Sequence, residues 1–266
     1  MHARPAAEYA LRTPPLRPTL SAFLIVHNEA RRLPACLASL GGVADEIVVL
    51  DDGSTDDTVA IARAAGATVA TRPFDDFGHQ KQAALELTSG AWVLSIDADE
   101  VLTPALVEEI RRVVMDAGAS NGYWIRRELT YLGAPLRFGG TGRDWVLRLA
   151  RRSAARFALR PVHEHLVVDG ATTRLRSPMR HVKYATLSEH VAVIDRYTTI
   201  IAAGKAARGG RFRAWHILRI PYELLVRLVV RAGILDGRAG IIYGGMAAFY
   251  AFLKYAKLYT ARRPDG

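Results

Sequence analysis

The chain has 266 residues, of which 50% are hydrophobic, and this composition excludes a disordered protein and is sufficient for one folded domain with an appendage. Its single cysteine, Cys36, excludes an intrachain disulfide and a zinc site built from cysteines, and it favours a reducing, cytoplasmic location. The formal net charge is +10, and residues 201–266 hold 12 Lys and Arg against 3 Asp and Glu, so nearly all of the excess lies in the last quarter of the chain.

The first 19 residues contain four prolines and lack the apolar core of a signal peptide. We therefore expect a disordered leader over residues 1–19. The longest uncharged run, Ala239–Leu253, is shorter than the roughly 20 residues that a membrane-spanning helix needs.

Between residues 20 and 116, apolar runs typical of strands alternate with helical periodicity. Strands are expected at residues 20–27, 46–50, 67–71 and 91–96. The helices between and after them are expected around Leu33, Leu37 and Leu40, after a cap at Ser54 or Thr55, over residues 78–90 with Gly90 as the stop, and from Thr103-Pro104 onward. This order predicts an α/β fold with a mainly parallel sheet, helices on both faces, and a ligand crevice at the carboxyl ends of the strands.

Polar residues follow three of these strands at that predicted crevice. They are His27, Asn28 and Glu29; Asp51 and Asp52; and Asp97, Asp99 and Glu100. Crowded carboxylates such as Asp97 and Asp99 repel each other unless a cation holds them, and Mg²⁺ or Mn²⁺ suits such oxygens. The alternative is a solvated acidic turn that caps the next helix.

The motifs IVHNEARRLPACLASL, VVLDDGSTDDT and LSIDADE, in this order, resemble inverting family-two glycosyltransferases of the GT-A fold, which is Rossmann-like. The resemblance implies that Asp51 and Asp52 contact the uracil or ribose of a nucleotide sugar and that Asp99 is the principal metal ligand. The donor-binding residues it implies are His27, Asn28, Glu29, Asp51, Asp52, Lys81, Asp97 and Ala98, and the metal ligands are Asp97, Asp99 and His181. Lys81 would meet the donor phosphate, or else be a surface lysine on a helix. His181 would complete the metal shell, or else be a structural histidine.

The middle third is rich in β-forming residues and is where we expect the acceptor site. GRDWVLRLARR, RPVHEHLVVDG, RHVKYATLSEHVAVIDRY and FLKYAKLYT resemble the lipopolysaccharide-core glucosyltransferase branch. Inverting transfer needs a base for the acceptor hydroxyl. Glu164 is the first candidate, Asp144 the second and His163 the third, although the acidic pair that usually marks the base in this family is absent here.

Residues 211–263 mix Lys and Arg with aromatic and aliphatic residues at roughly helical spacing. The pattern predicts basic amphipathic helices that lie on an anionic membrane surface, or else helices packed on the catalytic domain with solvated charges. Nucleic acid is disfavoured, because long apolar runs interrupt the positive residues.

The predicted organisation is a leader (1–19), a GT-A catalytic domain (20–200, with a nucleotide-sugar half at 20–116 and an acceptor half at 117–200), and a helical C-terminal extension (201–266). The predicted activity is metal-dependent transfer of a hexose from a UDP-sugar to a saccharide or lipid-linked acceptor of the cell envelope, on the inner face of the cytoplasmic membrane. The alternatives are a polyprenyl-phosphate glycosyltransferase, a phosphatase using DADEV as a DxDxV motif, and a non-catalytic scaffold.

Overall fold

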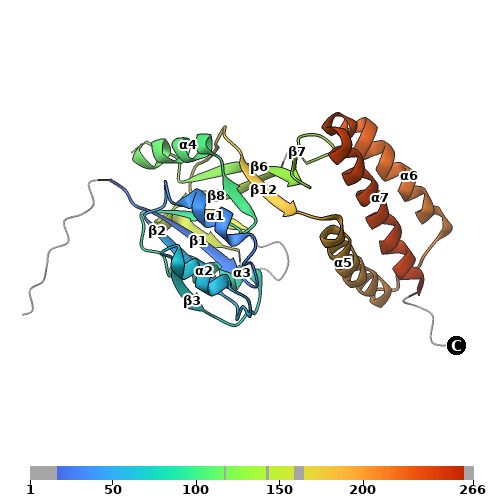
Figure 1. Ribbon diagram of the computed structural model, residues 1–266, viewed down its shortest axis with the longest axis horizontal. Helices are drawn as coiled ribbons and strands as arrows, with labels where there is room; N and C mark the ends of the chain where they lie inside the picture. The colour runs from blue at the N-terminus through green and yellow to red at the C-terminus, as the bar shows by residue number, and fades with distance from the viewer. Residues whose placement is uncertain (1–16, 117, 142–143, 159–164, 261–266) are drawn as a thin grey trace, which may run out of the picture.

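The computed structural model describes residues 17–116, 118–141, 144–158 and 165–260. One large sheet with helices on its faces forms one end of the molecule, and a group of helices near the C-terminus forms the other end (Figure 1). The leader expected at residues 1–19 therefore lies almost wholly outside the described residues.

Four parallel strands form the first half of the sheet, in the order β3-β2-β1-β4. They are β1 (Leu20–Val26), β2 (Glu46–Asp51), β3 (Thr68–Thr71) and β4 (Trp92–Ser95). Leu24 of β1 is paired with Val49 of β2, and nearly every residue of β1 is buried, as expected for a strand covered on both faces. The α/β class and the four strands predicted from the sequence are confirmed.

Helices follow these strands as the alternation predicted. They are α1 (Leu33–Leu40), α2 (Thr58–Ala64), α3 (Phe77–Glu86) and α4 (Pro104–Met115). The start of α4 is confirmed, because the Thr103 hydroxyl accepts a hydrogen bond from the Leu106 N–H at 3.2 Å and Pro104 occupies the first turn.

Two predicted helix ends are wrong. Helix α2 begins at Thr58 rather than directly after Ser54 or Thr55, because the Ser54 hydroxyl and the Thr55 N–H are bonded to Asn28 instead. Helix α3 ends at Glu86, before Gly90. Gly90 donates its N–H to the Ser21 hydroxyl at 2.8 Å, and a Cβ at Gly90 would stand 2.6 Å from that oxygen, so the glycine permits a close approach to β1.

The second half of the sheet is mixed, and it confirms the β-rich middle third. Its strands are β5 (Glu100–Leu102), β6 (Gly122–Tyr131), β7 (Ala134–Leu136), β8 (Asp144–Arg151), β11 (Thr172–Arg174) and β12 (Met179–Tyr184). Strand β8 runs antiparallel between β4 and β6, and β12 lies between β6 and β5. After the short helix η1 (Arg152–Ala154), β9 (Ala155–Phe157) and β10 (Leu166–Val168) form a separate ribbon.

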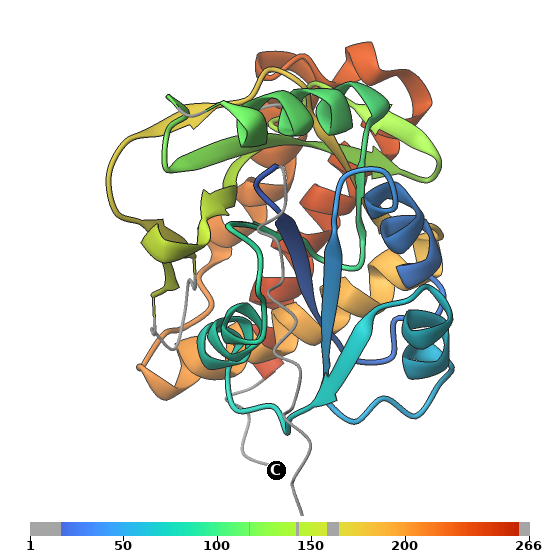
Figure 2. The same ribbon diagram turned by 90° about the vertical axis from the view of Figure 1, so that its left-hand side faces the viewer.

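The side chains of β1 alternate between two hydrophobic layers. Ala22 and Leu24 pack in the layer that α1 and α4 cover, whereas Phe23 packs on the opposite face with residues of α3 and the β9–β10 ribbon. Figure 2 shows the strands between these helices. The two layers fix the carboxyl ends of β1, β2 and β4 relative to one another.

The helical end of the molecule begins at Leu187, so the boundary expected at residue 200 falls inside a continuous helix. The elements are α5 (Leu187–Ala207), η2 (Ala214–Leu218), α6 (Arg219–Leu224), the π-helical turn η3 (Leu225–Val230), η4 (Gly233–Asp236) and α7 (Gly237–Thr260). Gly240, Gly244 and Ala248 form a buried small-residue face on α7. A Cβ on Gly244 would lie 2.6 Å from Leu228, so this face allows η3 to pack closely against α7.

Candidate active site

A cavity of about 610 Å³ opens at the carboxyl ends of β1, β2 and β4, where the sequence predicted a ligand crevice. We call it the donor cavity. The predicted site residues that line it are His27, Glu29, Asp52, Lys81, Asp97, Ala98, Asp99 and His181. Asn28 and Asp51 lie beside it without contributing to its lining. The structure thus brings most of the predicted donor and metal residues together, and their individual roles stay predictions.

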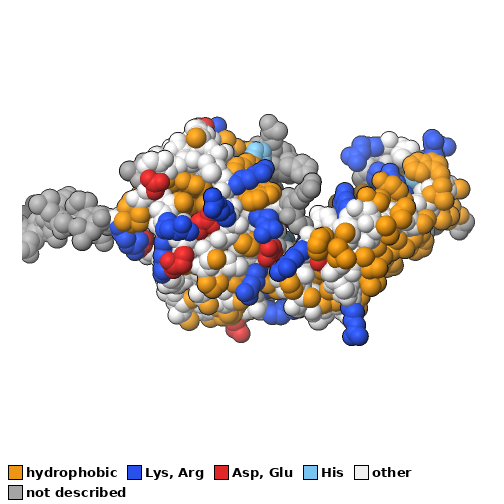
Figure 3. Space-filling view, turned by 90° about the horizontal axis from the view of Figure 1, so that it is seen from above, with side chains coloured by type: hydrophobic (Ala, Val, Ile, Leu, Met, Phe, Trp, Pro, Cys, Tyr) orange, Lys and Arg blue, Asp and Glu red, His pale blue; other side chains and the backbone are white. Residues whose placement is uncertain are grey.

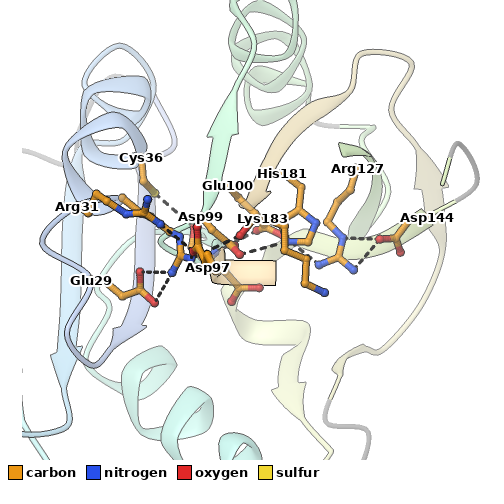
Figure 4. Close-up of polar contacts among 12 residues, drawn as sticks. Glu29, Arg31, Cys36, Asp97, Asp99, Glu100, Arg127, Asp144, His181 and Lys183 are labelled. Atoms are coloured by element: carbon orange, nitrogen blue, oxygen red, sulfur yellow. Dashed lines mark hydrogen bonds and ion pairs between the residues drawn. The ribbon is translucent and has the colours of Figure 1, made fainter. Parts of the chain in front are cut away.

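A network of paired charges forms the floor of this site (Figure 4). Lys81 Nζ lies 3.0 Å from Asp97 Oδ1, and Arg148 on β8 forms ion pairs with both Asp97 and Glu100. Arg127 on β6 extends the network, since its guanidinium lies 3.3 Å from Glu100 Oε1. Buried carboxylates are tolerated only when paired in this way.

Burial alone would raise the pKa of the Asp97 carboxyl, but the Arg148 guanidinium and the Lys81 ammonium outweigh it and hold this pKa well below its usual range. Asp97 is therefore ionised at any physiological pH. Both of its oxygens are engaged by cations, so Asp97 organises Lys81 and Arg148 at the floor of the cavity.

Asp99 and His181 form the pair best placed to hold a metal ion. His181 Nε2 lies 3.2 Å from Asp99 Oδ2. The pairing of β12 with β5 sets this contact, because it places His181 opposite Glu100 and lets the Val182 N–H donate to the Asp99 carbonyl at 2.7 Å. Figure 4 shows Asp99 beside Asp97 near the centre of the network and His181 next to them.

The donor chemistry of this pair fits a divalent cation. A carboxylate oxygen and an imidazole nitrogen are ordinary ligands of Mn²⁺, and Mg²⁺ uses few protein ligands and keeps water or phosphate in its other positions. Within residues 17–116, 118–141, 144–158 and 165–260, no group of three or more His, Cys, Asp or Glu side chains converges in a way that could hold an ion. Asp99 and His181 would therefore need a substrate phosphate and water to complete the coordination.

The turn after β2 is held by hydrogen bonds to Asp51, and one oxygen of this side chain has no donor among the described residues. Asp51 Oδ2 accepts the N–H groups of Gly53 and Ser54 at 2.9 and 3.0 Å. Gly53 has a φ of 74°, which favours glycine. Asp51 Oδ1 is buried and, among the described residues, has no hydrogen-bond partner. An unpaired buried acceptor is costly unless a ligand or water supplies a donor.

The rim of the donor cavity is aromatic. Asp52 accepts the Phe74 N–H at 2.6 Å, which draws the segment before α3 toward β2. Phe74 and Phe77 pack edge to face with ring centroids 4.9 Å apart, and they are 43% and 55% exposed. Exposed rings beside a polar cavity offer a flat surface to a base or a sugar.

Only one of the three predicted bases lies in the described part of the chain. Asp144 lines a second cavity of about 360 Å³ with His181 and Lys183, and its Oδ2 lies 2.7 Å from the Arg127 guanidinium. Glu164 and His163 lie outside the described residues.

Several residues at the site were missed by the sequence analysis. Arg148 carried a signal, because an arginine inside the apolar run WVLRLA requires a buried partner. Glu189 on α5 carried no signal in the sequence. It forms ion pairs with Arg31 and Arg32 at the start of α1, and these contacts tie the helical end of the molecule to the donor cavity.

Comparison with known proteins agrees with this geometry. The family model described as Glycosyl transferase family 2 matches residues 21–178. The lipopolysaccharide core biosynthesis glycosyltransferase LpsC of Rhizobium meliloti is 33% identical over 248 residues, which cover 90% of this chain and 92% of LpsC. An uncharacterized glycosyltransferase of Rickettsia typhi is 27% identical, covering 90% of this chain and 86% of its own.

Among solved structures, glucosyl-3-phosphoglycerate synthase of Mycobacterium tuberculosis, in complex with Mn²⁺ and UDP, is 27% identical with a TM-score of 0.36. The match covers 42% of this chain and 44% of that one. TarS of S. aureus is 15% identical with a TM-score of 0.44, covering 69% of this chain and 39% of TarS.

Proposed function

Since this chain belongs to glycosyl transferase family 2, resembles the lipopolysaccharide-core branch and is a glycosyltransferase, we propose that it moves a hexose from a UDP-sugar to a saccharide of the lipopolysaccharide core. The observation that carries this proposal is the convergence of three strand-end clusters on one cavity that pairs acidic and basic groups. Membership of the family excludes the phosphatase alternative. A polyprenyl-phosphate acceptor remains the second candidate, because the exposed apolar helices would suit a lipid-linked substrate.

For the donor, we assign the nucleotide to the β1–β2 side of the cavity and the diphosphate to its floor. Asp52 offers an acceptor to the uracil or ribose from the lining of the cavity, with His27 and Glu29 at the same edge. Asp51 and Asn28 lie beside that lining, and the buried Asp51 Oδ1, which has no donor among the described residues, would need a small shift of the turn to reach the nucleotide. Lys81, held by Asp97 beside Ala98, places an ammonium where charge develops on the leaving diphosphate. Asp99 and His181 would hold Mg²⁺ or Mn²⁺, and the ion would supply Lewis-acid stabilisation of that diphosphate.

The chain's own part in the transfer step is to remove a proton. The acceptor hydroxyl must lose its proton while it attacks the anomeric carbon on the face opposite the diphosphate, which inverts the configuration. Glu164 stays our first candidate for this base. Asp144 already shares a hydrogen-bonded ion pair with Arg127, so it would have to exchange that contact for the acceptor hydroxyl.

The base assignment is tested by Glu164→Gln, with Asp144→Asn as its matched variant. Loss of a general base lowers the rate by about 10²–10⁴-fold, and UDP affinity should not change. Transfer to delipidated core saccharides, with product anomers read by NMR, measures both rate and configuration. Unchanged turnover in Glu164→Gln would remove Glu164 as the base, and retained configuration would remove the inverting mechanism.

The donor site is tested by calorimetric titration of UDP with and without MnCl₂. Wild-type protein should bind UDP in a metal-dependent manner, and Asp99→Ala should weaken the binding by at least about tenfold, as loss of a metal ligand or its support does. Asp57→Ala is the control, because Asp57 precedes α2 and makes no capping hydrogen bond. Equal UDP affinity for wild type and Asp99→Ala would overturn the assignment of Asp99.

For location, we propose that residues 211–263 dock on the anionic inner face of the cytoplasmic membrane. Apolar side chains cover much of the helical end and basic side chains surround them (Figure 3). Trp215, Leu218, Val230 and Leu235 are each at least half exposed. No helix among the described residues has the length and apolar character needed to cross a bilayer. Docking at the surface fits such helices, since apolar side chains enter the interface and Lys and Arg meet anionic headgroups.

A further inference from the structure

A further cavity, of about 390 Å³, lies between β12, α5, α6, η3 and α7 at the helical end. We call it the tyrosine pocket, after the four tyrosines in its lining: Tyr184, Tyr197, Tyr243 and Tyr250. Its volume is within the range of about 300–1,000 Å³ that is usual for small-ligand sites. None of the predicted donor-binding or metal-binding residues lines this pocket.

Three cations stand over the tyrosine rings. Lys183 Nζ lies 5.6 Å from the centroid of Tyr184, Arg227 Cζ lies 5.9 Å from that of Tyr243, and Lys254 Nζ lies 5.5 Å from that of Tyr250. Each of these side chains lines the pocket. Aromatic faces hold the cations in position without neutralising them.

The positive charge of the pocket is only partly balanced. Among the described residues, neither the Lys183 nor the Lys254 ammonium has a carboxylate oxygen within 4.0 Å. Arg227 Nε lies 3.5 Å from Glu223 Oε2 but makes no hydrogen bond in the described structure, and it is buried. One carboxylate, Glu223, therefore faces three cations in the lining.

Burial, and then the charges of Lys205 and Arg219, lower the pKa of Lys254, and Glu223 only partly opposes them. Crowded cations of this kind are stabilised when an anion binds between them. The N–H group of Arg227 Nε also favours a bound anion, because a buried N–H without an acceptor is costly.

The floor of the pocket is aromatic and uncharged. His190 stacks on Tyr184 with centroids 4.0 Å apart and an interplanar angle of 14°, and its Nδ1 lies 2.9 Å from the Tyr131 hydroxyl. Burial, with a smaller effect from Lys183, lowers the pKa of His190 to about 4, so its ring is neutral near pH 7. The tyrosine walls are thereby preorganised for a ligand.

The tyrosine pocket is continuous with the rest of the active site. Lys183 and Tyr197 also line the donor cavity, and Lys183, Arg227 and Tyr243 also line the cavity that contains Asp144. Figure 4 shows Lys183 between the Asp99 side of the site and Arg127. A saccharide could therefore reach from the tyrosine pocket to the donor cavity.

We propose that the tyrosine pocket binds a sugar residue of the acceptor that bears a phosphate or carboxylate, with the cations on the anion and the tyrosine rings on the sugar. The inference rests on the proposed glycosyltransfer and names the chemical class of its acceptor as an acidic saccharide. Tyrosine supplies large, stiff apolar faces with a polar edge, which suits the CH faces and hydroxyls of a sugar ring.

The test is to titrate the full chain separately with glucose 6-phosphate, glucose and inorganic phosphate. Binding is measured by NMR saturation transfer and by calorimetry. Glucose 6-phosphate should bind at least tenfold more tightly than either glucose or phosphate alone. Lys254→Gln should weaken glucose 6-phosphate binding by fivefold or more and leave UDP binding unchanged, because Lys254 does not line the donor cavity. Arg208→Gln, an exposed charge change just after α5, should change neither.

Equal affinity of wild type and Lys254→Gln for glucose 6-phosphate would overturn the proposal, as would phosphate that binds as tightly as the sugar phosphate. A lipid headgroup is the other source of the same phosphate. If Lys254→Gln loses binding to phosphatidylglycerol vesicles while glucose 6-phosphate does not bind, the pocket belongs to the lipid and the saccharide assignment is wrong.

A failure of the donor-site assignment can be distinguished from a failure of the tyrosine-pocket proposal, because UDP is titrated on the same samples. Absence of UDP binding with Lys254-dependent glucose 6-phosphate binding would overturn the donor site and support the pocket. UDP binding without glucose 6-phosphate binding would support the donor site and overturn the proposal for the tyrosine pocket.

Discussion

In the sheet end of the molecule, up to Tyr184, the charges at the floor of the donor cavity are paired and few large apolar side chains reach solvent. In the helical end, from Leu187, many large apolar side chains reach solvent, and Lys254 has no paired carboxylate in the described structure. Of the large hydrophobic side chains that are exposed in the described residues, five lie before residue 187 and 18 lie at residue 187 or after it. Arg148 is 6% exposed and is paired with two carboxylates. Lys183, at the junction of the two ends, is exposed, and Lys254, within the helical end, is half-buried; neither has a paired carboxylate in the described structure.

This difference shows that the two ends are stable for different reasons. The sheet end has a two-layered core, and its charged network must be complete within the protein. The helical end buries few side chains, on α5 mainly His190, Ile194, Thr198 and Ala202, and leaves an apolar and basic surface unpaired. Such a surface is typical of an interaction with something outside the chain.

The largest effect should come from Arg148→Leu, which breaks the charge network of the sheet end. Removing one partner of a buried ion pair costs about 3–5 kcal/mol when the other charge is left uncompensated. Glu100, which is 0% exposed, would keep only Arg127 at 3.3 Å, and Asp97 would keep only Lys81, so we expect a loss at the lower end of that range, about 3 kcal/mol. Urea denaturation measures the free energy of unfolding. Arg180→Leu, on the exposed part of β12, is the control and should change stability by about 0.5 kcal/mol or less. Similar losses in the two variants would show that the network is not required for folding.

A second prediction concerns pH, and it tests whether the helical end relies on a neutral His190. Because the pKa of His190 is about 4 in the folded protein and near its ordinary value of 6.5 when unfolded, the unfolded chain binds more protons between these pH values. The contribution of His190 to the free energy of unfolding is therefore complete above pH 6.5. It is lost as the pH falls toward 4, and the loss is about 3 kcal/mol.

The measurement is the pH dependence of urea unfolding for wild type and His190→Phe, together with the NMR titration of the His190 ring. The variant should lose less stability than wild type between pH 7 and pH 4. Parallel curves, or a ring that titrates near pH 6.5, would contradict a buried neutral histidine.

The sheet end could be predicted closely from the sequence because each of its elements repeats a local pattern. The four apolar strands, the Thr103-Pro104 helix start and the crevice at the strand ends follow from spacing alone, and the structure has all of them. The cap of α2 was missed because Asn28, 26 residues before Ser54, takes up the polar groups of that turn. A contact at that separation leaves no trace in local periodicity.

The helical end was harder to predict, since its charges looked alike in sequence. Composition gave the basic amphipathic character of residues 211–263 but could not separate the cations that line the tyrosine pocket from those that face solvent. Lys254 and Lys257 are three residues apart on α7, yet Lys257 bonds Asp195 at 2.7 Å and Lys254 lines the pocket. Only the packing of α5 against α7 decides this.

A third prediction breaks the packing on which the helical end depends. Gly244→Val places a side chain where a Cβ already lies 2.6 Å from Leu228, so η3 must move away from α7. Overpacking of this kind costs about 1–3 kcal/mol. Gly245→Val is the control, because a Cβ at Gly245 meets no atom within 4 Å. Thermal denaturation of both variants measures the difference, and equal melting temperatures would contradict the close packing. Since η3 carries Arg227, the Gly244 variant should also lose binding of glucose 6-phosphate.

The smallest effect on folding, and the sharpest on function, should come from the exposed apolar surface of the helical end. Leu218→Ser with Val230→Ser removes two side chains that are 67% and 70% exposed, so the free energy of unfolding should hardly change. Their insertion into a membrane interface would contribute at least about 1.4 kcal/mol, so binding to phosphatidylglycerol vesicles should fall about tenfold.

Leu87→Ser with Met115→Ser removes two exposed apolar side chains of the sheet end, 49% and 56% exposed, and should leave vesicle binding unchanged. Co-sedimentation at increasing salt separates the two contributions, because screening weakens the attraction of the basic side chains and leaves apolar insertion intact. Equal loss in the two pairs would mean that the helical end does not direct docking. Loss in the first pair alone would assign the unpaired surface to the membrane and the tyrosine pocket beside it to an acceptor delivered there.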